Sequence, residues 1–179
     1  MLAHIHVLCG DYAQSVSHSE RAVRADDKCL GHAGDDNFYT TARCHDLHLF
    51  MYAAMFWGNT ATPSMPQSKL ISKSAPFMAA ILDGYAAMRT HVLVCFGCWQ
   101  ELVASPGLEA PSRRPIGVAM HAYGQGVAHA ALGHIDEAEA CQAAYEAACA
   151  AIPEAMVILS NPVHDVLEIG AAMLEGELE

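Results

Sequence analysis

Residues 126–138 read GVAHAALGHIDEA and carry the clearest structural signal in the chain. Gly126 and Gly133 stand seven residues apart, about two turns of an α-helix. A helix that must reverse within a few residues ends most easily on a left-handed residue, and glycine takes that conformation without strain. Residues 136–137 are both acidic and suit the positive end of a following helix. The stretch therefore predicts a tight turn between two helices, which approach closely at Gly126 and Ala138.

A related pattern occurs at four places: an apolar residue, a glycine, a small or polar residue, and then an aromatic or aliphatic one. Successive glycines are 48, 39 and 36 residues apart, in the range that helix–turn–helix repeats show. We expect the residue two positions after each glycine to pack between the two helices. The glycines are Gly10, Gly58, Gly97 and Gly133, and the packing residues are Tyr12, Thr60, Trp99 and Ile135.

The spacing of apolar residues predicts an all-α fold. Alternating β-branched stretches are nearly absent, whereas several windows place apolar residues at helical intervals. The hairpins resemble tetratricopeptide repeats (TPRs), and we expect them to form a short right-handed α-solenoid. Asn161 and Pro162 suggest an N-cap and a first helical residue for the last helix. The expected helices span residues 2–9, 12–27, 37–57, 66–74, 76–95, 115–132, 135–151 and 162–176.

The predicted organisation has three parts. Residues 1–102 would form TPR-like hairpins, with a first helix that is truncated because the first turn glycine comes at residue 10. Residues 103–115 are dense in proline and glycine and predict a linker, and residues 31–36 predict a shorter loop. Residues 116–179 would form a further hairpin and an acidic terminal helix. Since solenoids need capping units, we expect either a piece of a longer array or ends that are covered.

Composition and charge limit the classes of partner. Hydrophobic residues make up 53% of the 179 residues and charged residues 16%, which is typical of a globular chain. The formal net charge of −11 argues against nucleic-acid binding, which needs a basic surface. Residues 115–179 hold 10 of the 20 acidic residues and no lysine or arginine. This charge pattern predicts either a solvated acidic face or a surface that selects a basic protein partner.

The cysteines and the chain start bear on the cellular setting. The seven cysteines are odd in number, and one isolated C-x-x-C, at Cys95 and Cys98, has no second pair. We expect reduced thiols that pack as small apolar side chains. The start lacks the features of a secretory signal, and the apolar run 47–57 is too short to span a membrane. The expected location is the cytosol or an organelle interior.

Three stretches resemble one protein family. Residues 37–55, NFYTTARCHDLHLFMYAAM, are similar to the signature helix of proteins related to tetratricopeptide repeat protein 38. Residues 4–7, HIHV, which precede the turn at Gly10, and residues 171–178, AAMLEGEL, are similar to the same family. The resemblance implies an α-helical repeat scaffold and no known catalytic activity. It also implies that this chain corresponds to a middle stretch of a longer protein.

Histidines offer an alternative site. His45 and His48 lie three residues apart, so a helix projects both from one face. Two imidazoles at this spacing can share a metal ion, for which Zn²⁺ is the first expectation. Packed histidines that hydrogen-bond backbone carbonyls are the competing interpretation. Further candidate ligands are His4, His6, Cys44 and Asp46.

The leading functional hypothesis is a non-catalytic scaffold without a cofactor. Repeat solenoids bind peptides or helices along a groove, and the acidic C-terminal third would select basic features. The alternatives are a metal- or small-molecule-binding enzyme near His45 and His48, and a structural subunit of a homo-oligomer or larger assembly. No G-x-S-x-G, P-loop or G-x-G-x-x-G motif assigns a catalytic residue. The aromatic side chains expected to line the groove are Tyr39, Tyr52, Tyr85, Tyr123 and Trp99.

Overall fold

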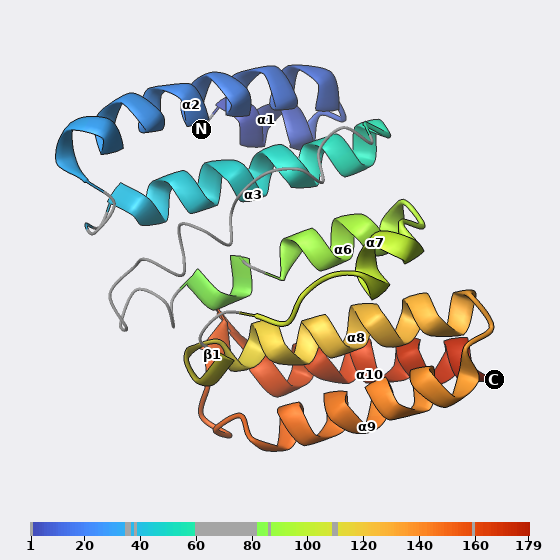
Figure 1. Cartoon of the computed structure of the whole chain (residues 1–179). Coiled ribbons are helices and arrows are strands. Elements are labelled where there is room, and N and C mark those ends of the chain that lie inside the picture. The colour runs from blue at the N-terminus through green and yellow to red at the C-terminus, as the bar shows by residue number, and fades with distance from the viewer. Residues whose placement is uncertain are drawn as a thin grey trace. The chain divides into compact units, whose positions relative to one another are not determined.

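The described part of the chain is predominantly α-helical, as the sequence predicts. The computed structural model describes residues 2–34, 37, 39–59, 82–85, 87–108, 111–158 and 160–179. The chain divides into two compact units, Met1–Val92 and Leu93–Glu179 (Figure 1). Within the described ranges, none of the helices combines the length and hydropathy needed to cross a bilayer.

The first unit is built on a hairpin of two long helices. Helix α2 packs against both α1 and α3, and these two also touch each other. Buried apolar side chains from α2 and α3, such as Val23 and Leu47, fill the interface. The boundary between the two units falls within helix α6. The bounds are α1 Leu2–Leu8, α2 Tyr12–Ala33, α3 Tyr39–Trp57 and α6 Met88–Cys95.

The second unit contains three longer helices that pack on one another. Helix α8 contacts α9, α10 and α7, and α9 also contacts α10 (Figure 1). Strands β1 and β2 pair antiparallel, with Val157 opposite Pro162. Residues 105–108 have no regular secondary structure. The bounds are α7 Trp99–Val103, η2 (a 3-10 helix) Pro111–Arg113, α8 Pro115–Ala131, α9 Ile135–Ala150, β1 Val157–Ile158, β2 Asn161–Pro162 and α10 Val163–Leu178.

The four predicted turn glycines all end helices in the left-handed conformation. Their φ angles are +74° at Gly10, +75° at Gly58, +65° at Gly97 and +77° at Gly133. At each turn the glycine N–H donates to the carbonyl three residues back, and the next N–H donates to the carbonyl five residues before it. This pair of hydrogen bonds defines the Schellman motif. The predicted role of these glycines as helix ends is therefore confirmed.

Small residues let the helices of the second unit approach closely. A Cβ on Gly126 would lie 2.8 Å from Leu174 Cδ1 and 3.3 Å from the Cβ of Cys141. Ala138 is completely buried. These observations confirm the predicted close-packing positions. Gly170 of α10, which the sequence interpretation did not single out, is tighter still.

The residues two positions after the turn glycines differ in how they are packed. Tyr12 stacks on Phe56, with ring centroids 5.3 Å apart, and Trp99 packs against a core cluster of the second unit. Ile135, in contrast, is 46% exposed, so its predicted packing position was wrong. Ala138 and Tyr145 are the buried residues of α9 instead. Thr60 lies outside the described residues.

Helix α2 is longer than predicted. It continues to Ala33, so the expected loop over residues 31–36 was wrong for residues 31–33. Buried Leu30 anchors this last part of the helix. The helix ends at Gly34, whose φ is +78° and whose N–H donates to the carbonyl of Leu30. Gly31 was predicted to lie in this loop, but its backbone is helical. The described residues leave open space where a Cβ on Gly31 would lie.

Other boundaries also differ from the prediction. Helix α7 was not predicted, and the long helix expected over residues 76–95 is described only at 82–85 and as α6. The helix expected over residues 66–74 lies outside the described residues. The predicted N-cap of the last helix was one residue early: Asn161 and Pro162 both pair in β2, and Pro162 is the N-cap.

Candidate functional site

Histidines from two helices meet in the first unit. The rings of His4 on α1 and His45 on α3 stack, with centroids 5.0 Å apart and planes 21° apart. His45 Nδ1 lies 3.1 Å from Asp46 Oδ1. His48 instead meets Tyr85 edge-on, with ring centroids 5.3 Å apart. The structure thus joins His4 to the predicted α3 pair, although His48 faces a different aromatic neighbour.

The surroundings of His4 and His48 favour neutral imidazole. Burial lowers the pKa of His48, and the nearby His45 and His91 rings lower it further. Partial burial also lowers the pKa of His4, followed by the effects of His45 and the chain's amino terminus, while Asp46 opposes the shift. A neutral imidazole can bind a metal ion or exchange hydrogen bonds with its neighbours.

The other predicted ligands are placed less favourably for metal binding. His6 stacks on His18, with centroids 5.1 Å apart, and its Nδ1 lies 3.7 Å from Asp11 Oδ2. Cys44 is fully buried, and burial raises the pKa of its thiol to about 11. Across the described ranges, no three His, Cys, Asp or Glu side chains are grouped so as to hold a metal ion. The zinc site remains a prediction.

A polar seam between α2 and α3 was missed by the sequence interpretation. Arg43 is 8% exposed, and its Nη2 lies 2.7 Å from Asp27 Oδ1. Asp26 is 4% exposed. Burial raises the pKa of Asp26, although the hydrogen bond from Tyr39 partly offsets that effect. The helix predicted over residues 12–27 ended at this acidic pair, whereas both residues lie within α2 and connect that helix to α3.

The four candidate groove tyrosines differ in accessibility. Tyr39 and Tyr52 are 43% and 36% exposed, and Tyr85 is half-buried against His48. Tyr123, in the second unit, is only 1% exposed, and its hydroxyl donates to Met173 Sδ at 3.7 Å. Its predicted groove role was therefore wrong, because the ring is part of the core of that unit.

Trp99, the remaining aromatic residue of the predicted groove, is half-buried. It packs against Leu93, Leu102 and Ala128 of the second unit. Packing within the unit therefore covers part of this side chain.

Helix α10 presents two apolar faces. One face is buried and comprises Val163, Leu167, Gly170 and Leu174. The other face remains open: Val166 is 40% exposed, Ile169 65% and Met173 51%. We call these three residues the α10 stripe. Sequence periodicity could not separate the two faces, because each has the spacing of a core-facing helix.

Acidic side chains accompany the α10 stripe. Asp165 lies one helical turn before Ile169, and Glu177 lies one helical turn after Met173. Both are exposed. Since residues 115–179 contain no lysine or arginine, this part of the chain supplies no such cation to neutralise them.

These two regions offer different chemistry. The stacked histidines provide imidazole rings beside the carboxylate of Asp46. The α10 stripe provides apolar surface beside negative charge, which suits a complementary macromolecular surface. No protein-family model, curated protein or solved structure matches the chain.

Proposed function

We propose that the chain is a non-catalytic helical-repeat scaffold that binds a protein partner. The observation that carries this proposal is the α10 stripe, since α10 already contributes a complete buried face to its own unit. Isolated exposed apolar residues are ordinary, but a row of them along one helix face is typical of an interaction surface.

The turn geometry supports the repeat part of the proposal. Four Schellman turns recur along the chain, and small residues bring α8, α9 and α10 close together. Hairpins of this kind are the building units of TPR-like right-handed α-solenoids, which bind peptides and helices on their surfaces. We propose that the chain belongs to this architectural class.

A second apolar row favours the related alternative of a structural subunit in a larger assembly. On α1, Leu2 is 59% exposed, Ile5 54% and Leu8 87%. Ala3 is the buried residue of this helix. A neighbouring subunit that covered this row would remove three large apolar side chains from water.

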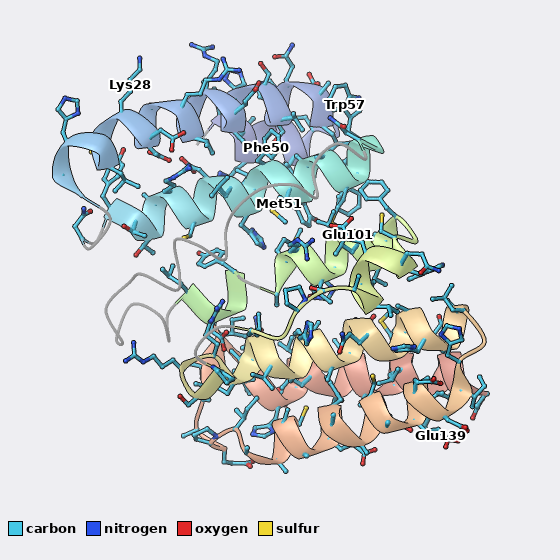
Figure 2. All side chains as sticks on the ribbon, viewed as in Figure 1. Lys28, Phe50, Met51, Trp57, Glu101 and Glu139 are labelled. Atoms are coloured by element: carbon cyan, nitrogen blue, oxygen red, sulfur yellow. The ribbon has the colours of Figure 1, made fainter. Side chains whose placement is uncertain are left out.

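Site-specific photo-crosslinking tests the scaffold proposal. A photoreactive residue would replace Ile169 in the α10 stripe, Ile5 on α1, or Glu139 as a control. Figure 2 shows Glu139 on α9, with its side chain pointing away from α8. In cells that make the protein, we expect a defined protein adduct at Ile169 and none at Glu139. The same adducts at all three positions would contradict the proposal, whereas an adduct confined to Ile5 would favour the subunit alternative.

A further inference from the structure

We infer that the α10 stripe docks an amphipathic helix of a partner protein whose apolar face is bordered by lysine or arginine. This inference rests on the proposed scaffold function and specifies the partner's chemistry. Three features of α10 support it: the shape of the stripe, the charge beside it and the rigidity of the helix beneath it.

The spacing of the stripe suits a helical partner. Val166, Ile169 and Met173 follow one another at intervals of three and four residues, so they form a continuous ridge along one side of α10. Their exposed fractions of 40%, 65% and 51% leave apolar surface on every turn of that ridge. A partner helix with apolar residues at matching intervals can cover such a ridge along its length.

The charge beside the stripe selects the partner. Asp165, one turn before Ile169, and Glu177, one turn after Met173, flank the ridge and are exposed. A second copy of this chain would bring the same acidic flank against itself, and each copy carries a net charge of −11. A partner with lysine or arginine beside its apolar residues would pair with these carboxylates, which gives specificity and faster association.

The helix beneath the stripe is held rigidly, so the surface is already formed before binding. Tyr145 of α9 donates a hydrogen bond to the carbonyl of Leu167, and Leu174 packs where Gly126 leaves room. Within the stripe, the Met173 sulfur accepts a hydrogen bond from Tyr123. The flexible methionine side chain can still adapt to the partner's side chains. A preformed surface reduces the entropy lost on binding.

Synthetic helical peptides test this inference with the full chain. One peptide carries leucines at intervals of three and four residues with lysines on either side. A second replaces every lysine with glutamate, and a third has the composition of the first in a scrambled order. We expect the ordered lysine peptide to bind at least about tenfold more tightly than either other peptide, measured by fluorescence anisotropy. Its affinity should fall as salt is raised.

Matched substitutions localise the binding. Ile169→Gln should weaken binding of the ordered lysine peptide about tenfold, since it removes apolar contact area, whereas Ile5→Gln on α1 should leave binding unchanged. Glu177→Lys should weaken binding about threefold. Glu139→Lys changes the net charge equally but lies on α9, and it should have little effect. Circular dichroism of each variant checks that the helices are retained.

Several results would overturn the inference. Equal binding of the ordered and scrambled lysine peptides would indicate attraction to the acidic surface alone. If the glutamate peptide bound as tightly as the ordered lysine peptide, charge would not select the partner. If the chain self-associated and Ile169→Gln abolished that association, a second copy of the chain would be the occupant of the stripe. The proposed function is tested separately: a defined cellular adduct at Ile169 without binding of the ordered lysine peptide would leave the scaffold proposal intact and overturn only this inference.

Discussion

Single residues set the ends of the helices, and Gly133 shows how. Its φ of +77° is strained for any residue that carries a Cβ. Among the described residues other than its chain neighbours, none has an atom within 4 Å of where a Cβ would be, so the requirement for glycine here comes from the backbone and not from crowding. Gly31 has equally open surroundings within α2, which makes it a matched comparison.

Replacing Gly133 by alanine should therefore lower the free energy of unfolding by about 1 kcal/mol, because alanine disfavours the left-handed conformation. The control Gly31→Ala should raise it by up to about 1 kcal/mol, because alanine is the better helix former. Urea denaturation followed by circular dichroism measures both. Equal effects of the two substitutions would show that backbone conformation does not govern the turn.

The cysteines should differ in reactivity according to burial. Cys44 is fully buried, and burial raises its pKa to about 11. Its thiolate fraction at neutral pH is then on the order of a hundredfold below that of an ordinary thiol. We expect iodoacetamide to label the exposed Cys9 and Cys29 well before Cys44, as followed by mass spectrometry. Rapid labelling of Cys44 in the native protein, at the rate found in denaturant, would contradict its place in the core.

At the scale of helices, the second unit depends on how closely α10 approaches α9. A Cβ on Gly170 would lie 2.6 Å from Tyr145 Oη, and that hydroxyl also bonds the carbonyl of Leu167. The phenol ring cannot move aside without disturbing this buried hydrogen bond. Gly176 lies on the same helix, and in the described part of the chain no side chain beyond its immediate neighbours comes within 4 Å of its Cβ position.

Gly170→Ala should consequently lower the free energy of unfolding by about 1–3 kcal/mol, the usual cost of overpacking. Gly176→Ala should leave stability unchanged or raise it by up to about 1 kcal/mol. Thermal unfolding followed by circular dichroism distinguishes them. A Gly170→Ala protein as stable as the Gly176→Ala protein would mean that α10 and α9 can separate freely at this point.

At the scale of the whole molecule, histidine protonation should make stability depend on pH. The pKa values of His48 and His4 are lowered in the folded chain, so the unfolded chain binds protons more readily. Their contribution to stability is full above the unfolded pKa, about 6.5, and is lost as the pH falls through the lower folded values.

We therefore expect the free energy of unfolding to decrease between pH 8 and pH 5, and the double variant His4→Gln/His48→Gln to show a shallower decrease. Urea denaturation across this range provides the comparison. Both proteins retain Asp26, whose raised pKa acts in the opposite direction, so its contribution largely cancels in the difference. Parallel profiles for the two proteins would exclude these histidines as the cause.

The candidate sites show the limits of reading side chains from sequence. The spacing of His45 and His48 placed both on α3, but only the folded chain brings His4 onto His45 and Tyr85 onto His48. Tyr123 was indistinguishable in sequence from exposed Tyr52, yet it is buried. The α10 stripe was missed because its spacing resembles that of a core face.

The sequence by itself determined the helical class, the four glycine turns and the close-packing positions at Gly126 and Ala138. These features depend on backbone conformation and side-chain size, which act over a few residues. Tertiary structure alone decided which apolar face of α10 is buried, which tyrosines remain accessible and where Asp26 and Arg43 lie. Burial is the reason for this division: it depends on which helix packs against each face, and residues distant in the chain supply those contacts.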